Sequence, residues 1–156
     1  MDPGRLKKQA AIIDPALDHG TNKALYCDPT TNWLYPDRVI MDLEGHALWQ
    51  SNGLRLKGPD VEPGRRIAVV WGDSVVFGVC PTWPDIFTSW PETINEFSPD
   101  CTFLNGGIEG IQYTDVIKRA IQFNCEHDVV VNIVVLGWHL VGANKNLEAV
   151  LRNSLG

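Results

Sequence analysis

The chain has 156 residues, and its 13 Lys and Arg against 19 Asp and Glu give a formal charge of −6. This length fits one domain, or one domain with an added arm, and a hydrophobic content of 44% argues against disorder. The negative charge, without a basic stripe, argues against nucleic acid as a partner. No apolar run approaches the roughly 18 residues of a membrane span. Residues 1–13 lack the apolar segment of a secretory signal, so a cytoplasmic location is expected.

The cysteines are widely spaced and form no C-x-x-C pair, which argues against a zinc site and against a thioredoxin-like motif. We expect reduced, mostly buried thiols, although an even count leaves disulfides open. The sequence implies no metal and no organic cofactor. The four cysteines are Cys27, Cys80, Cys101 and Cys125.

Turn-forming pairs are frequent in the first 64 residues, among them Asp14-Pro15, Asp28-Pro29 and Pro63-Gly64. This composition predicts an irregular N-terminal arm over residues 1–64 with short elements. Its apolar side chains, Trp33 and Trp49 among them, are numerous enough for the arm to pack on a core. Residues 65–156 are then expected to form an α/β domain.

Apolar runs alternate with helical patterns in this second part. The first run, 67–71, is continuous and closed by Gly72, which is typical of a strand covered on both faces. Strands separated by helices favour a parallel sheet. The further expected elements are a broken helix over 83–97, a strand over 101–104, a helix over 114–124, a strand over 129–136 and a helix over 146–155. In the helix over 114–124, Thr114 is the expected N-cap, and Val116, Ile117, Ala120 and Ile121 are expected to share one face.

Ligands of open parallel sheets bind beyond the carboxyl ends of the strands. Gly72-Asp73-Ser74 follows the first strand, where a serine would leave the sheet at a tight turn and enter a helix. The alternative is that Ser74 only caps that helix. After the second strand comes Asn105-Gly106-Gly107-Ile108-Glu109-Gly110, whose last N–H is expected to point at the same pocket. The alternative there is an ordinary flexible turn.

The third strand is followed by Gly137-Trp138-His139. Of the four histidines, His139 alone stands at a predicted strand end, which makes it a candidate site residue. A purely structural histidine is the alternative.

Together these three segments resemble the SGNH, or GDSL, hydrolase superfamily, over roughly residues 52–146. Gly72-Asp73-Ser74 matches its first block, with the nucleophile falling on Ser74, and Asn105 to Gly110 matches its second block, whose last glycine donates to the oxyanion. The resemblance implies a three-layer α/β/α domain with a parallel sheet in flavodoxin-like strand order. It also implies a serine esterase or acyl-hydrolase acting on a small-molecule ester.

The chain departs from the family pattern in two places. His139 stands where the third block has Asn, so it is expected to complete the oxyanion hole formed by the Ser74 and Gly110 N–H groups, or to serve as the base in place of the family's late histidine. Residues 140–156 contain neither the Asp nor the His of the family's last block, so the sheet is expected to stop after its third strand. The other histidines that could act as base are His19, His46 and His127.

Asp73, Asn105 and Trp138 flank these positions and are assigned to substrate binding. The alternative function is a non-catalytic, degenerate domain of this type that binds a ligand or a protein partner. Such a domain would self-associate, or be completed, through the exposed edge of its sheet. A flavodoxin-like nucleotide binder is disfavoured because the chain has no phosphate-binding glycine motif after a strand.

Overall fold

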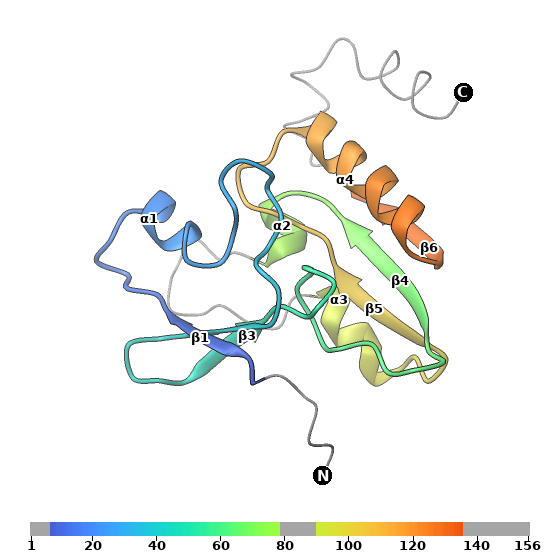
Figure 1. Ribbon diagram of the computed structural model, residues 1–156, viewed down its shortest axis with the longest axis horizontal. Helices are drawn as coiled ribbons and strands as arrows, with labels where there is room; N and C mark the ends of the chain where they lie inside the picture. The colour runs from blue at the N-terminus through green and yellow to red at the C-terminus, as the bar shows by residue number, and fades with distance from the viewer. Residues whose placement is uncertain (1–6, 79–89, 136–156) are drawn as a thin grey trace.

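The computed structural model describes residues 7–78 and 90–135 (Figure 1). This part of the chain is mixed α/β, with two sheets of three strands each. One sheet belongs to the N-terminal part and the other, which is all parallel, to the second part. The predicted positions Trp138 and His139, and the helix expected over 146–155, lie outside the described residues. Among the described residues, no helix is long and apolar enough to cross a membrane.

The parallel sheet confirms the three strands expected from the apolar runs. It consists of β4 (Arg66–Trp71), β5 (Cys101–Asn105) and β6 (Val129–Val134). The order is β5-β4-β6, and both pairings are parallel, so the first strand of this sheet lies between the other two. The last four residues of β4 are fully buried, as a continuous apolar run predicts.

Strand β6 is less buried than β4, although its sequence is also mostly apolar. Val130, Val131 and Ile133 are exposed. In the described part of the chain β6 pairs with β4 alone, so it forms one margin of the sheet. Asn132, which interrupts its apolar run, accepts a hydrogen bond from Nε1 of Trp71 at 2.8 Å and thereby ties β6 to the end of β4.

In the described ranges, three helices accompany this sheet: α2 (Ser74–Phe77), α3 (Trp90–Thr93) and α4 (Tyr113–Glu126). A 3₁₀ turn, η1 (Ile94–Glu96), continues α3, so the broken helix expected over 83–97 is confirmed in its described half.

The buried face of α4 differs in part from the predicted one. Tyr113, Val116, Arg119, Ala120 and Phe123 are buried, at helical spacing, whereas Ile121 faces outward. Thr114 is not the N-cap, because the helix starts one residue earlier and Gln112 occupies the cap position without a side-chain hydrogen bond.

The N-terminal arm is more regular than predicted. Its strands β1 (Gln9–Ile12), β2 (Arg38–Met41) and β3 (Ala47–Gln50) form a sheet in that order, and α1 (His19–Lys23) lies between β1 and β2 in the chain. β2 and β3 are antiparallel, whereas β1 pairs in parallel with β2. The elements are short, as predicted, but their pairing into one sheet was not predicted, because each strand has only four residues and β1 pairs with a strand far along the chain.

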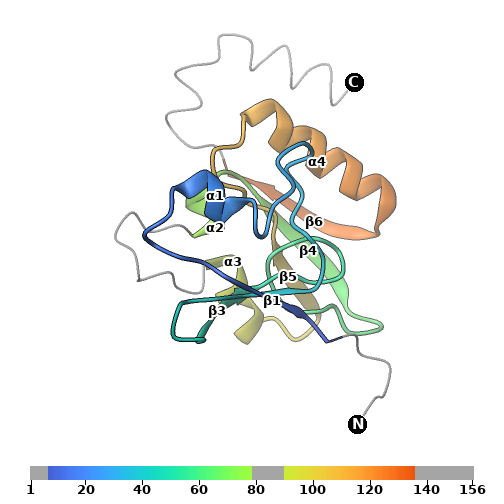
Figure 2. The ribbon, with the colours of Figure 1, turned by 60° about the vertical axis from the view of Figure 1, so that its left-hand side comes forward.

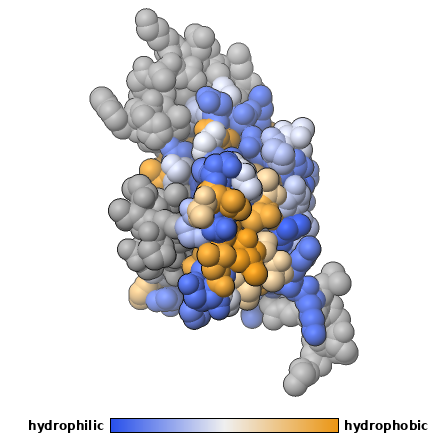
Figure 3. All heavy atoms as spheres, turned by 90° about the vertical axis from the view of Figure 1, so that its left-hand side faces the viewer, coloured by the Kyte–Doolittle hydropathy of each residue, from blue (hydrophilic) through white to orange (hydrophobic). Residues whose placement is uncertain are grey.

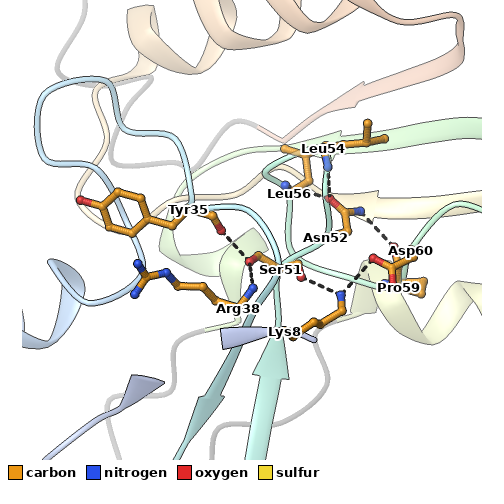
Figure 4. Close-up of polar contacts among 9 residues, drawn as sticks. All are labelled: Lys8, Tyr35, Arg38, Ser51, Asn52, Leu54, Leu56, Pro59 and Asp60. Atoms are coloured by element: carbon orange, nitrogen blue, oxygen red, sulfur yellow. Dashed lines mark hydrogen bonds and ion pairs between the residues drawn. The ribbon is translucent and has the colours of Figure 1, made fainter. Parts of the chain in front are cut away.

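Polar side chains hold the turns that follow β3 (Figure 4). Asn52 accepts from the N–H groups of Leu54 and Leu56 and donates to the carbonyl of Pro59 at 2.9 Å. The Lys8 ammonium reaches both the carbonyl of Ser51 and the carboxylate of Asp60, each at 2.9 Å (Figure 4). These contacts fix the segment that leads from the arm into β4.

Arm and parallel sheet share one hydrophobic core, which contains two groups of aromatic rings. Each group takes rings from both parts of the chain, so the core is continuous between them. The first group consists of Trp33, Trp71 and Phe123, and the second of Tyr26, Trp49 and Phe77.

Two further contacts line the outer side of β5. Lys57 of the arm forms an antiparallel bridge with Asn105 through two backbone hydrogen bonds of 3.1 and 2.9 Å. The side-chain amide of Asn95 both accepts from the N–H of Phe103, at 2.7 Å, and donates to its carbonyl, at 2.8 Å.

The arm also presents apolar side chains to the outside. Hydrophobic residues gather along the middle of the face that is turned to the left in Figure 1 (Figure 3). The exposed large hydrophobic residues of the arm are Ile12, Leu17 and Leu43.

Candidate functional site

Ser74 stands where the sequence predicts it, at the carboxyl end of the central strand. It is the first residue of α2 and is partly buried. Asp73, the preceding residue, is nearly inaccessible and occupies the N-cap position, where its carboxylate accepts from the N–H of Val75 at 2.9 Å. Gly72 makes the turn possible, since a Cβ there would collide with the side chain of Val76. The turn that presents Ser74 is therefore fixed from both sides.

The segment after β5 lies against this turn. The N–H of Gly106 donates to the carbonyl of Val70 at 2.7 Å, and the N–H of Ile108 donates to that of Gly72 at 3.2 Å. A Cβ at Gly107 would lie 2.5 Å from the backbone nitrogen of Phe77. The structure thus brings the Gly72–Ser74 segment and the Asn105–Gly110 segment together, as a parallel sheet with these strand ends requires.

The third strand end reaches the same place. The N–H of Val135 donates to the carbonyl of Trp71 at 2.9 Å, immediately before the described residues end. Trp138 and His139 lie beyond this point, so their assigned roles stay predictions.

The buried side chain of Asn105 fixes the loop that follows β5 by hydrogen bonds to the backbone. It is fully buried, its amide donates to the carbonyl of Val76 at 2.7 Å, and its side-chain oxygen accepts from the N–H of Gly107 at 2.9 Å. These bonds link β5 to α2. The geometry gives Asn105 a positioning role at the Ser74 turn, and its contact with substrate stays a prediction.

Gly110 ends the loop in an open, left-handed conformation. Its φ is +64°, it is exposed, and no atom lies within 4 Å of the position of a Cβ. Its N–H is the predicted second donor to an oxyanion. The residue before it, Glu109, turns the other way and is buried against the arm.

Three arm residues hold Glu109. Its carboxylate contacts Nε2 of His19 closely and accepts from the hydroxyl of Tyr26 at 3.2 Å, while its carbonyl accepts from the ammonium of Lys23 at 2.5 Å. His19 and Lys23 are the first and last residues of α1. The sequence singled out His19 only as a substitute base, and no local pattern pairs it with a carboxylate 90 positions along the chain.

Burial dominates the electrostatics of this contact. It raises the pKa of Glu109 above its ordinary value, although the charge of His19, the hydrogen bond from Tyr26 and the charge of Lys23 act in the opposite direction. Burial, with the neighbouring carboxylate as the second cause, also raises the pKa of Tyr26. The contact places a half-exposed imidazole on a buried carboxylate, and a carboxylate in this position can orient an imidazole ring.

The other two described histidines are placed less favourably than His19 for acting as a base at the Ser74 turn. His127 follows α4 and lies against Phe123, with ring centroids 4.3 Å apart and the ring planes tilted by 43°. His46 lies in the β2–β3 hairpin, where Nδ1 contacts the carboxylate of Asp42 at 3.0 Å. Neither lies in the segments that meet at the Ser74 turn.

Within the described residues, one group of side chains has the composition of a metal site. Ligand atoms of Asp42, Glu44 and His46 lie within 4.8 Å of one another, on the exposed hairpin turn. Asp42 also accepts from the N–H of His46 at 2.7 Å, so hydrogen bonds within the turn explain the cluster. Of the three cysteines in the described ranges, only Cys27 is buried, whereas Cys101 is intermediate and Cys125 is exposed; all three are free thiols, and Cys80 lies outside these ranges.

Sequence reasoning missed two buried cations near the strand ends. Lys57 donates from its ammonium to the carbonyl of Phe77, and Arg119 donates from Nη1 to the carbonyl of Gly106. The only signal for Arg119 was a charged residue on the otherwise apolar face of a predicted helix. Lys57 gave no signal, because it lies in a turn-rich segment.

Comparisons with known proteins identify no similar protein. A scan against family models finds no match, and neither a curated protein nor a solved structure matches the chain.

Proposed function

We propose that this chain is a serine esterase or acyl-hydrolase of the SGNH type, with Ser74 as the nucleophile. The observation that carries the proposal is the meeting of two strand ends, through the hydrogen bonds from Gly106 to Val70 and from Ile108 to Gly72. A serine on a fixed turn, beside a loop that ends in an exposed glycine, has parts from which acyl-transfer sites are built.

The proposed fold is the three-layer arrangement with flavodoxin-like order. It is supported by the order β5-β4-β6 and by the placement of α3 and α4 on either side of the parallel sheet (Figure 2). In such a sheet the first strand is central and its carboxyl end faces the ligand. Ser74 directly follows that strand.

In the proposed reaction the Ser74 hydroxyl attacks the ester carbonyl and a histidine accepts its proton. The N–H groups of Ser74 and Gly110, with His139 as the third donor, stabilise the oxyanion. The alcohol leaves with the proton from that histidine, and water then releases the acyl group from Ser74.

Among the described histidines, His19 fits the role of base best because it alone contacts a buried carboxylate, that of Glu109. Figures 1 and 2 place α1, which His19 begins, and α2, which Ser74 begins, at the same end of the parallel sheet. We expect His19→Gln to lower kcat, because it removes the base, whereas His46→Gln should leave kcat unchanged.

The test of the nucleophile uses p-nitrophenyl acetate and a fluorophosphonate reagent, which loses fluoride as it attaches to an activated serine. The unaltered chain should hydrolyse the ester and be labelled. Ser74→Ala should reduce kcat/KM at least about a thousandfold and abolish labelling. Ser98→Ala, a matched change in the turn after η1, should leave both unchanged.

Hydrolysis that survives Ser74→Ala would contradict the assignment. A folded chain that neither hydrolyses the ester nor reacts with the fluorophosphonate would favour the non-catalytic domain that binds a ligand or a partner.

A further inference from the structure

A cavity of about 390 Å³ lies between the arm and α4, apart from the Ser74 turn. Figures 1 and 2 show the arm loop that contains residues 30–33 beside α4. Arg55, Lys118 and Arg119 line the cavity, and Asp115 is its one acidic lining residue. Lys118 contacts Asp115 at 3.3 Å, so two arginine charges face the cavity without a lining carboxylate of their own. The cavity is therefore cationic in a chain whose overall charge is negative.

Arg119 is the unusual member of this lining. It is only 3% exposed, and its guanidinium lies 4.5 Å from the ring centre of Trp33 and 5.5 Å from that of Trp71. Nη1 donates to the carbonyl of Gly106 at 2.7 Å. These contacts fix the plane and the direction of the group.

The rest of the guanidinium has no partner in the described part of the chain. Nε and Nη2 of Arg119 are buried and make no hydrogen bond there. These two nitrogens form the side edge of a guanidinium, whose parallel N–H groups match the two oxygens of a carboxylate or phosphate. Buried donors without an acceptor are costly, so such an edge needs an explanation.

We propose that this cavity binds a small molecule through a carboxylate or phosphate group, with the Nε and Nη2 edge of Arg119 as the bidentate donor. Arg55 and Lys118 supply further positive charge at the cavity wall. Arg55 is also held with φ at +63°, a conformation that a non-glycine residue adopts at a cost and that often marks a binding site.

The protonation state of Arg119 agrees with this role. Burial lowers its pKa to about 10, which leaves it cationic at neutral pH. A bound anion would offset the burial of this charge. The proposal does not rest on the hydrolase assignment, because none of its residues belongs to the segments that carry Ser74 or Gly110.

Titration of ¹⁵N-labelled chain with inorganic phosphate and, separately, with acetate tests the proposal, at an ionic strength held constant with chloride. The Nε–H resonance of Arg119 should shift and saturate with one or both anions. Tighter binding of phosphate would identify a phosphorylated ligand, and tighter binding of acetate a carboxylate. If neither anion gives a saturable shift at Arg119, the proposal is wrong.

Three variants distinguish the contribution of the bidentate Arg119 edge to anion binding from the contribution of positive charge alone. Arg119→Lys keeps the charge but loses the edge, and it should weaken binding at least about tenfold. Arg66→Lys, the same change on an exposed strand residue, should leave binding unchanged. Lys118→Gln, at a side chain that is 76% exposed, should weaken binding only about threefold without altering the fold.

The Lys118 variant keeps the test decisive if Arg119→Lys fails to fold. Binding by Lys118→Gln equal to that of the unaltered chain would overturn the proposal, and so would equal binding by a folded Arg119→Lys chain, because the anion would then bind elsewhere.

Discussion

The ammonium of Lys57 donates a hydrogen bond to the carbonyl oxygen of Phe77 at 2.6 Å, although Lys57 is only 1% exposed. Phe77 is the last residue of α2, where carbonyl groups lack partners within the helix. Lys57 also lies 5.0 Å from the ring centre of Phe77 and 5.8 Å from that of Trp49. A residue of the arm therefore completes the short helix that begins with Ser74.

Lys57→Met tests this contact because it keeps the apolar stem and removes the donor. We expect the free energy of unfolding to fall by about 1–3 kcal/mol, since the buried carbonyl of Phe77 loses its partner. Urea denaturation at neutral pH measures the change. Lys118→Met, on the exposed side of α4, should change stability by about 0.5 kcal/mol or less. A Lys57→Met chain as stable as the unaltered one would mean that the cost of burying the ammonium cancels the bond.

Gly107→Ala should disturb the Ser74 turn directly. The added Cβ would lie 2.5 Å from the backbone nitrogen of Phe77 and 2.9 Å from the carbonyl carbon of Val76, so α2 must move. We expect a loss of about 3 kcal/mol in unfolding free energy. Amide resonances of residues 74–77 should shift at the same time.

The control for this change is Gly64→Ala. Gly64 has a positive φ of +84° but no atom within 4 Å of a Cβ, so only backbone strain is added, at about 1 kcal/mol. Equal losses for the two variants would contradict the close packing of the loop on α2.

Glu109→Gln should alter how stability depends on pH. A carboxyl group whose pKa is raised by folding stabilises the folded state most when it is protonated. That contribution is fully present below the ordinary pKa of Glu, about 4.3, and is lost as the pH rises through the raised value. The glutamine variant lacks this loss, so its melting temperature relative to the unaltered chain should increase between pH 4 and pH 7.

Thermal unfolding followed by circular dichroism across this pH range measures the difference. Glu62→Gln, an exposed change before β4, is the control and should give a flat difference. A difference for Glu109→Gln that falls with rising pH would show that the contacts with His19 and Lys23 outweigh burial.

The parallel sheet could be predicted because its signals are local. A continuous apolar run closed by a glycine predicts β4, and helical spacing of Val116 and Ala120 predicts α4. The arm sheet could not be predicted in this way. Gln9 pairs with Arg38, and strands of four residues carry too few positions to show an alternation.

For the candidate site, the sequence located the strand ends but not the contacts between them. The position of Ser74 follows from the end of an apolar strand. The bond from Asn105 to Val76, and the contact of His19 with Glu109, join residues that only tertiary packing brings together. Arg119 was passed over because a charge on an apolar helix face has no meaning until its aromatic neighbours are known.

The contacts along the outer side of β5 decide in which direction the parallel sheet can grow. The outward-facing backbone groups of Phe103 are taken by the Asn95 amide, and those of Asn105 by the backbone of Lys57. A strand arriving at this side would find its hydrogen-bonding positions already filled. These contacts therefore act as a cap on the β5 side of the sheet, which a further strand could pair with only by displacing them.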